Sequence, residues 1–438
     1  DWEEVCPHTK EEEVFVFGNP PYLGSRNQKA DQKADMHIIF GDRGKSLDYI
    51  SCWFEKGNRY IQNFPKSKFA FVSTNSICQG EQVALLWEPI LKSSEIAFAY
   101  KSFKWTNNAK YQAGVTCVII GLQLKGLSKT KRLFNAEKEE KVDNINPYLT
   151  SGSSLFFRRL SKPISDGFNE LRFGSMPNDG GNLILDKDEK DKLLSLDPSL
   201  VNVVKGFIGS SEFINGQKRW CIFMKDTDVV KYIEFPEIKR RLENVKLHRE
   251  KSTEKSTRAL ADTPNRFYFS AYKETDAIII PRVSSERRKY IPMGFLGKEN
   301  VISDSAFAIY DASLWLFGIL TSEMHMVWVR TVGGRLKTDY RYSAGLCYNT
   351  FPFPSISSSK KSEIEEAATN ILLVRAAYPE KTLADLYDPD KMPQDLREAH
   401  EALDTIVESC YPGAPFANDE ARLECLFKLY EKMTANKK

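Results

Sequence analysis

Short apolar runs alternate with amphipathic stretches along the first 124 residues of the chain. Four of these runs have the length and the side chains of buried strands: residues 14–18, 68–74, 95–103 and 115–124. Two stretches between them place apolar side chains at helical spacing: residues 46–62 and 80–93. The last two strands flank a turn at 106–113, which predicts an antiparallel pair. This order predicts the second half of a doubly wound (Rossmann-like) α/β sheet.

The pattern changes after this segment. A polar stretch at 125–143 predicts a connection out of the sheet. Residues 144–356 predict a second unit of α+β type, in which Asn215-Gly216 is a hairpin signal. Its further short strands are expected at residues 277–283, 305–310 and 326–332.

The C-terminal residues predict a small helical domain. Amphipathic helices separated by prolines are expected at residues 361–378, 393–409 and 419–433. The apolar stripe through Leu396, Leu403 and Ile406 predicts a packing surface. The predicted domains therefore span residues 1–143, 144–356 and 357–438.

Composition indicates a large folded protein. With 438 residues, 42% of them hydrophobic and 12% aromatic, the chain can bury several cores and is not disordered. No apolar run reaches the ~18 residues needed to cross a bilayer, and no signal peptide opens the chain, so we expect a cytoplasmic protein. The eight cysteines are scattered and the histidines number five, so we expect reduced thiols and neither disulfides nor a zinc site.

The distribution of basic residues is more informative than the formal net charge of +3. A first cluster, between Lys239 and Arg258, is equally consistent with a solvated helix face. Two later clusters, at 282–290 and 330–342, interleave arginine and lysine with tyrosine and with Gly333-Gly334. This mixture is typical of loops that clamp phosphates and contact bases.

The first strand runs directly into Asn19-Pro20-Pro21-Tyr22. An amine conjugated to a base ring has its lone pair spread into the ring. Something must therefore accept hydrogen bonds from its two N–H groups so that the nitrogen can act as a nucleophile. The side-chain oxygen of Asn19 and the carbonyl of Pro20 can be these two acceptors. The prolines fix the backbone, and Tyr22 offers a flat face to an extruded base. The alternative interpretation is a strand followed by a proline-rich turn.

Further blocks follow this tetrapeptide: Leu23-Gly24-Ser25, Gln32 to Met36, Asp48 to Lys56, Phe69 to Ser76, Phe103 to Ala109 and Val115 to Gly121. In their order and content the chain resembles the amino-methyltransferases, and more closely the methyltransferase part of the MmeI-like (type IIL) restriction-modification enzymes. The resemblance runs through almost the whole chain, and the segment 144–356 resembles the target recognition domain of that family.

The resemblance implies methyl transfer from S-adenosyl-L-methionine (AdoMet) to the exocyclic amine of an adenine flipped out of duplex DNA. The implied catalytic residues are Asn19, Pro20, Pro21 and Tyr22. Phe103 or Trp105 is a candidate second aromatic against the base, with a core role as the alternative. Within this group, asparagine rather than serine at the first motif position favours adenine over cytosine.

The chain has no glycine-rich turn after a strand with an acidic residue ending the next strand, the pattern that cradles this cofactor. Enzymes of this group place their AdoMet motifs before the tetrapeptide, so we expect these motifs upstream of Asp1, in an N-terminal half of the same protein. We therefore expect the chain alone to be poorly stable and inactive. Magnesium is expected only if a nuclease domain is attached upstream.

The recognition segment supplies the predicted contacts to double-stranded DNA. Arginine can bond guanine at two points, and Glu286 or Asp339 can accept from a cytosine amine. Ion pairs within the protein, such as Glu286 with Arg287, are the competing explanation. The predicted DNA-binding residues are Arg258, Arg282, Glu286, Arg287, Arg288, Lys289, Arg335, Lys337, Asp339 and Arg341. The helical domain is expected to brace this segment or to add contacts to the DNA backbone.

Three alternatives stay open. A protein-glutamine methyltransferase can use the same four residues, although such enzymes usually end soon after the motif and this chain continues far beyond Tyr22. A sequence-specific DNA-binding module without catalysis would bind duplex DNA in a salt-dependent manner without affinity for AdoMet. For a structural fragment with a vestigial motif, specific DNA binding and activity of the intact protein would both be absent.

Overall fold

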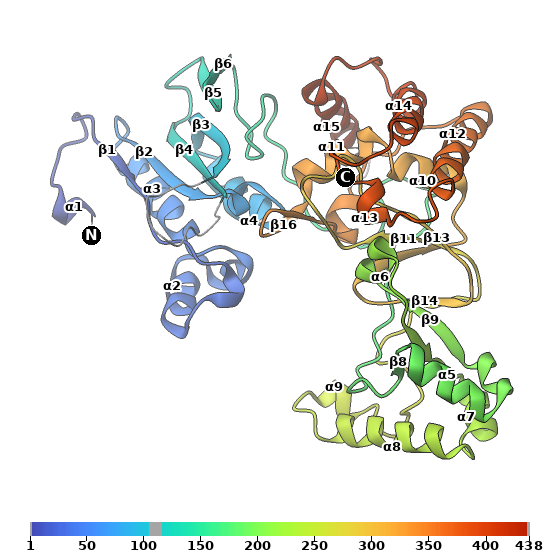
Figure 1. The fold of residues 1–438 in the computed structure, drawn as a ribbon. Helices are drawn as coiled ribbons and strands as arrows, with labels where there is room; N and C mark the ends of the chain where they lie inside the picture. The colour runs from blue at the N-terminus through green and yellow to red at the C-terminus, as the bar shows by residue number, and fades with distance from the viewer. Residues whose placement is uncertain (1, 105–115, 436–438) are drawn as a thin grey trace. The chain divides into compact units, whose positions relative to one another are not determined.

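A computed structural model describes residues 2–104 and 116–435 (Figure 1). The chain folds into two compact units, each assembled from segments that are far apart in the sequence. The first unit contains residues 1–164, 327–352 and 416–438, and the second contains residues 165–326 and 353–415. The C-terminal segment therefore contributes helices to both units, and the compact units differ in extent from the three consecutive domains that the sequence predicts.

A six-stranded mixed sheet forms the centre of the first unit, in the order β1-β2-β4-β3-β5-β6. The strands are β1 (Phe15–Gly18), β2 (Lys68–Thr74), β3 (Ser94–Lys104), β4 (Thr116–Leu124), β5 (Lys131–Asn135) and β6 (Lys138–Val142). β1 pairs with β2 and β3 with β5 in parallel, whereas β4 is antiparallel to both β2 and β3. The predicted antiparallel pairing of β3 with β4 is confirmed.

One face of this sheet is buried by α3 (Ser51–Asn63) and α4 (Glu81–Ile90). Alternate residues of β2 point into that face, where Phe69 and Phe71 are 1% and 2% exposed. Gly57 of α3 packs closely on the sheet, because a Cβ at this position would lie 2.9 Å from the Phe69 ring. Further helices of this segment are α1 (Trp2–Val5) and α2 (Ala30–Phe40).

The opposite face of the sheet is only partly covered. The remaining residues of β2 are half-buried, and the Phe98 ring lies across Gly121, where a side chain would collide with it. β1 stands at the edge of the sheet in Figure 1, and its Phe15 and Phe17 are 59% and 81% exposed. An apolar strand left at an edge offers unpaired backbone groups to a further strand.

Aromatic side chains join the other segments of the first unit. The Trp328 ring lies 4.7 Å from Phe157 and 6.0 Å from Phe427 and Tyr430, measured between ring centroids. The Trp328 indole N–H is satisfied by the Thr350 hydroxyl at 3.2 Å. The elements of these segments are α11 (Glu323–Val332), which begins in the second unit, β16 (Gly334–Leu336), β17 (Asp339–Arg341), η5 (Ala344–Tyr348) and α15 (Asp419–Ala435).

Two four-stranded sheets organise the second unit, in the orders β14-β9-β10-β8 and β13-β11-β15-β7. The strands of the first are β8 (Ile184–Leu185), β9 (Val204–Ile208), β10 (Trp220–Ile222) and β14 (Asn300–Ile302). Those of the second are β7 (Arg172–Phe173), β11 (Ala277–Pro281), β13 (Gly294–Leu296) and β15 (Ala306–Tyr310). Every residue of β11 and β15 is buried, so this antiparallel pair forms the centre of its sheet.

Helices surround these two sheets. They are α5 (Lys187–Leu196), α6 (Ser210–Asn215), α7 (Asp226–Tyr232), α8 (Pro236–Glu250), α9 (Lys255–Arg258), α10 (Leu314–Leu320), α12 (Ser358–Ala376), α13 (Leu383–Leu386) and α14 (Gln394–Glu408). The predicted helices 361–378, 393–409 and 419–433 correspond to α12, α14 and α15 and are confirmed.

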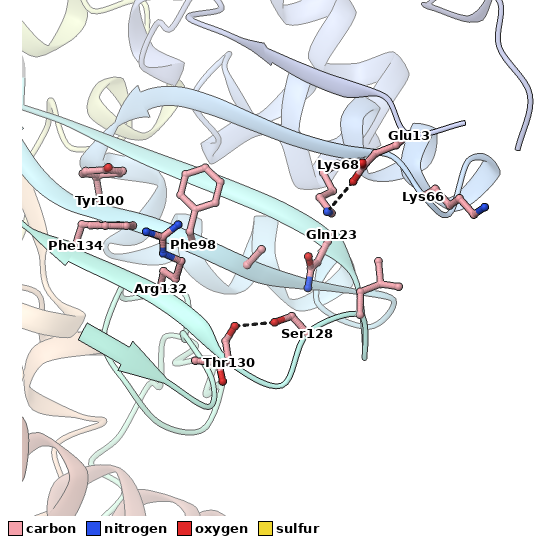
Figure 2. Close-up of a pocket in the computed structure, with 12 residues that line it drawn as sticks. Glu13, Lys66, Lys68, Phe98, Tyr100, Gln123, Ser128, Thr130, Arg132 and Phe134 are labelled. Carbon is pink, nitrogen blue, oxygen red and sulfur yellow. Dashed lines mark hydrogen bonds and ion pairs between the residues drawn. The ribbon is translucent and has the colours of Figure 1, made fainter. Parts of the chain in front are cut away.

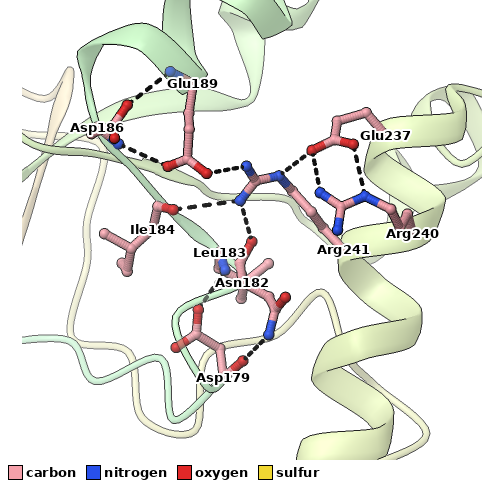
Figure 3. Close-up of polar contacts among 9 residues, drawn as sticks. All are labelled: Asp179, Asn182, Leu183, Ile184, Asp186, Glu189, Glu237, Arg240 and Arg241. Carbon is pink, nitrogen blue, oxygen red and sulfur yellow. Dashed lines mark hydrogen bonds and ion pairs between the residues drawn. The ribbon is translucent and has the colours of Figure 1, made fainter.

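Two buried arginines of α8 fix the loops around this helix. Arg241 is 6% exposed, and its guanidinium lies 2.8 Å from Glu237 and 2.7 Å from Glu189 (Figure 3). Arg249 is 0% exposed and donates to backbone carbonyls at 2.7–3.1 Å. These carbonyls belong to Pro177, Asn178, Leu260, Thr263 and Arg266. Both side chains therefore serve the fold, although the sequence places them in a basic cluster.

Three local predictions are wrong. The stretch 125–143 carries β5 and β6, since charged side chains suit strands at a sheet edge that faces solvent. Asn215-Gly216 ends helix α6, with Gly216 as its left-handed C-cap at a φ of 67°, and forms no hairpin. Residues 326–332 belong to helix α11, because a run of mostly buried side chains fits a buried helix as well as a strand.

Replacing Arg249 by leucine should lower the free energy of unfolding by roughly 3 kcal/mol or more, because several buried carbonyls would lose their donor. Urea denaturation measures this change. Arg240→Leu on the same helix is the matched control, since the Arg240 side chain is 57% exposed, and its effect should be much smaller. Equal losses for the two variants would contradict the anchoring role of Arg249.

Candidate active site

The tetrapeptide Asn19 to Tyr22 leaves the sheet at the carboxyl end of β1. This strand runs parallel to β2, with Gly18 opposite Phe71. In open α/β sheets, ligands bind beyond the carboxyl ends of parallel strands. Asn19 is exposed and Tyr22 is half-buried. The fold thus presents the Asn19 amide to solvent at the edge where a substrate is expected.

Tyr22 rests against β4. Its hydroxyl contacts the Cys117 thiol, and burial together with this thiol raises the pKa of the Tyr22 phenol. Cys117 is fully buried and stands opposite Phe103 of β3 in the strand register. Phe103 therefore lies on β3, directly beside the strand whose Cys117 contacts Tyr22. Trp105 lies outside the described residues.

A separate cavity of about 770 Å³ opens over the same sheet (Figure 2). Tyr100 and Phe134 stack in its wall, with ring centroids 4.3 Å apart. Lys68 Nζ lies 3.0 Å from the Glu13 carboxylate, so this charge is paired within the protein. Glu13 precedes β1, which places the cavity toward the amino end of that strand and away from Asn19. The residues that line the cavity do not include the tetrapeptide.

The predicted DNA-binding residues of the second unit contact other protein groups. The Arg282 guanidinium lies 4.6 Å from the centre of the Phe173 ring and donates to the Asp304 carbonyl at 2.6 Å. Arg258 donates to the Ser252 carbonyl at 2.7 Å. These contacts hold both arginines in place.

The run from Glu286 to Lys289 is tied to the helical segments. Arg287 forms an ion pair with Asp390, and Lys289 Nζ lies 3.7 Å from the Glu323 carboxylate. Arg288 is half-buried, and Glu286 is exposed. The internal ion pairs weighed as a competing explanation are therefore present at Arg287 and Lys289.

A hairpin of β16 and β17 carries the other predicted contacts. The Arg335 guanidinium covers the Tyr340 ring at 4.0 Å. Lys337 is exposed at the turn with a φ of 57°, and Asp339 and Arg341 lie on β17. This hairpin belongs to the same compact unit as the tetrapeptide.

Three domain models of one family match successive parts of the chain. Residues 1–135 match the MmeI DNA-methyltransferase domain, residues 151–355 the MmeI target recognition domain and residues 356–437 the MmeI C-terminal domain. The chain belongs to the MmeI-like family. The family resemblance predicted from the sequence is thus confirmed for all three segments, whereas the matches do not support the prediction that the chain carries only the second half of the methyltransferase domain.

Known relatives agree with this assignment. The MmeI-like chain is 50% identical over 437 residues to DNA methyltransferase A of Bacillus subtilis (strain 168), which is 99% of this chain and 49% of that protein. It therefore spans about half the length of this curated relative. A solved structure of the type IIL restriction-modification enzyme MmeI in complex with DNA matches with a TM-score of 0.89 and 39% identity, over 99% of this chain and 59% of that one. This match confirms the predicted fold class.

Other classes of site are not evident in the described part of the MmeI-like chain. Within residues 2–104 and 116–435, no three His, Cys, Asp or Glu side chains are grouped so that they could hold a metal ion. In the same ranges, no helix combines the length and the apolar character needed to cross a membrane. None of the eight cysteines forms a disulfide.

A buried polar network in the second unit was not predicted from the sequence. The Tyr290 phenol donates to Asp404 at 2.6 Å, and its ring stacks on His400 with centroids 4.1 Å apart. The other Asp404 oxygen accepts from the Glu323 N–H at 2.6 Å. Tyr290 directly follows Lys289, so the network ties this basic run to α14. The sequence does contain a sign of this network. His400 and Asp404 are four residues apart, so two polar residues lie on the apolar stripe of that helix.

The Asp404 network gives stability a defined pH dependence. Burial raises the pKa of the Asp404 carboxyl from its ordinary 3.8 to about 6. The folded chain therefore holds a proton that the unfolded chain releases between these values, so the contribution of Asp404 is largest at low pH and is lost as the pH rises through about 6.

Urea denaturation at several pH values between 4 and 7 should show the stability of the wild type, relative to Asp404→Asn, falling as the pH rises. Asp395→Asn is the matched control, because the Asp395 carboxylate is exposed on the same helix. A wild-type-minus-variant difference that is constant with pH would contradict a raised pKa at Asp404.

Proposed function

We propose that the protein containing this chain is a site-specific DNA methyltransferase of a restriction-modification system, which uses AdoMet to methylate the exocyclic amine of adenine in duplex DNA. The single observation that carries this proposal is the placement of Asn19 to Tyr22 at the carboxyl end of a parallel strand within a methyltransferase domain. The relatives add support, since one is named a DNA methyltransferase and the other is a restriction-modification enzyme in complex with DNA.

The proposed chemistry needs two acceptors and one flat ring. The Asn19 side-chain oxygen and the Pro20 carbonyl accept hydrogen bonds from the two N–H groups of the amine, which directs the nitrogen lone pair out of the ring and toward the methyl group. Tyr22 stacks on the base once it has left the duplex, and Phe103 is the candidate second aromatic. AdoMet supplies the methyl group when bound. The choice of adenine over cytosine rests on the resemblance and on asparagine at the first motif position.

We infer that the described residues alone do not form a complete AdoMet site. They contain no glycine-rich turn between a strand and a helix of the kind that cradles a nucleotide. The β1 edge exposes Phe15 and Phe17, as expected for a sheet that other strands extend. We therefore propose that AdoMet is bound mainly by residues other than those described, and that the described residues alone do not transfer the methyl group.

We assign recognition of duplex DNA to two groups of residues. One group lies on the β16–β17 hairpin, around Arg335, Lys337 and Arg341, and the other is the run from Arg287 to Lys289, where DNA would have to compete with the ion pairs to Asp390 and Glu323. Lys337 is exposed at the hairpin turn, which suits a phosphate contact. Arg335 is held over Tyr340 in a fixed orientation, which suits bidentate contact with a guanine.

The exposed edge at β1 supports a second candidate function. In this alternative the chain is a sequence-specific DNA-binding module without catalysis of its own. Salt-dependent binding of duplex DNA by this chain, with no affinity for AdoMet and no methylation by any longer protein that contains it, would favour the module.

Asn19→Ala should reduce methyl transfer about 100-fold or more, because one of the two acceptors for the amine is lost. The measurement uses labelled AdoMet and duplex DNA of varied sequence with the longest natural polypeptide that contains this chain, followed by identification of the modified base. Asn27→Ala is the matched control, since Asn27 is exposed and lies outside the tetrapeptide. Label on protein glutamine, or none on DNA from the folded wild type, would reject the proposal.

Lys337→Gln should weaken binding to all duplex sequences alike and reduce the slope of log affinity against log salt by about 0.9, as expected for one lost phosphate contact. Fluorescence anisotropy at several salt concentrations measures both quantities. Lys428→Gln is the control, because Lys428 is 71% exposed and pairs with Glu424 on α15. The same slope for Lys337→Gln and the wild type would exclude this phosphate contact.

A further inference from the structure

Leu23, which directly follows the tetrapeptide, is held by hydrogen bonds to both its backbone N–H and its backbone carbonyl. The Leu23 N–H donates to Asp48 Oδ1 at 2.8 Å. The Leu23 carbonyl accepts from the Tyr49 N–H at 3.0 Å and from the Gln28 side-chain amide at 3.1 Å. Gln28, Asp48 and the Tyr49 backbone are here named the Leu23 clamp.

The clamp is anchored in the core of its unit. Asp48 and Gln28 are 4% and 7% exposed. The Asp48 N–H donates to Gln82 Oε1, in the first turn of α4, at 2.8 Å. Asp48 Oδ1 also accepts from the Ile50 N–H, at the start of α3, at 3.3 Å. The position of Leu23 is therefore tied to both helices that bury one face of the sheet.

Capping of α3 alone does not account for these contacts. Burial raises the pKa of the Asp48 carboxyl, and a buried carboxylate is costly unless it is hydrogen-bonded. A helix start needs only one such acceptor, which exposed Ser, Asn or Asp residues commonly supply. The Asp48 oxygen that serves α3 also bonds a residue 25 positions earlier, and this residue is the one directly after Tyr22.

The clamp fixes the downstream end of the tetrapeptide, whose upstream end is already fixed. Gly18 is paired with Phe71 of β2, and the rings of Pro20 and Pro21 set their own φ angles. The backbone between Gly18 and Leu23 therefore has little freedom. Both the Pro20 carbonyl and the Tyr22 ring are held relative to the sheet.

We propose that Asp48 is a positioning residue for the loop from Asn19 to Tyr22 and acts through the Leu23 N–H. The proposal rests on the proposed function, since it concerns the same methyl transfer. Asp48 does not touch the base in this mechanism. It fixes the backbone that carries the acceptor carbonyl and the stacking ring, and a displacement of about 1 Å at such groups lowers a rate on the order of 100-fold.

The test compares Asp48→Ala and Asp48→Asn by single-turnover methylation of duplex DNA, in the longest natural polypeptide that contains this chain. Asp48→Ala should lower the rate constant on the order of 100-fold. Asp48→Asn should lower it less, because its amide oxygen can still accept from the Leu23 N–H. The amplitude of the single-turnover reaction should stay unchanged. A folding defect would instead lower this amplitude, because it removes active molecules without altering the rate constant of the molecules that remain folded. Asp42→Asn is the matched control, because the Asp42 carboxylate is 82% exposed.

Hydrogen exchange gives a readout that does not depend on catalysis. The Leu23 amide should exchange slowly in the wild type and in Asp42→Asn, and roughly tenfold faster or more in Asp48→Ala, where its acceptor is gone. Unchanged Leu23 exchange in Asp48→Ala, or a loss of amplitude at an unchanged rate constant, would overturn the positioning role. Absence of methyl transfer by the wild type, with Leu23 exchange still responding to Asp48→Ala, would instead overturn the proposed function, and the role of Asp48 in transfer with it.

Discussion

Parallel pairing of β1 with β2 is the constraint on which the candidate site depends. This register sets where the chain leaves the sheet, so that Asn19 emerges beyond Gly18 at the carboxyl edge. The antiparallel strand β4 then brings Cys117 to the same edge, against Tyr22. Loss of the pairing between β1 and β2 would separate the tetrapeptide from its supports, even if every side chain of the motif were retained.

Several loops of the structure are held in place by hydrogen bonds with buried polar side chains. Arg249 gathers carbonyls from two loops, Asp48 gathers N–H groups around Leu23, and Asp404 joins Tyr290 to the start of α11. Each of these groups is costly to bury alone and is retained where several partners converge on it. Loops that lack a continuous apolar core are thereby held in one arrangement.

Basic residues of the chain are of two kinds, those that are buried and hydrogen-bonded within the protein and those that are exposed. Arg241 and Arg249 lie in a basic cluster of the sequence but are buried and satisfied within the protein. Lys337, at the turn of the β16–β17 hairpin, is exposed. Charge counted along the sequence therefore overstates the surface available to DNA on α8, and burial is the property that distinguishes the two cases.

Elements whose patterns are local could be predicted from the residues alone. The runs at 68–74 and 95–103 and the helix at 393–409 are present within about two residues, because alternation and helical spacing report directly on burial. The tetrapeptide also carries its chemistry in its residue types. Patterns failed where one signal fits two structures, as at Gly216, whose left-handed φ serves a helix C-cap as well as a hairpin.

Contacts between residues far apart in the sequence could not be predicted in this way. Asp48 bonds a peptide unit 25 residues away, and Tyr290 bonds Asp404 across 114 residues, so no local pattern could pair them. The compact units also combine segments from both ends of the chain. The physical reason is that side-chain spacing specifies the face of an element that is buried, whereas the partner on that face is selected only when the whole core packs.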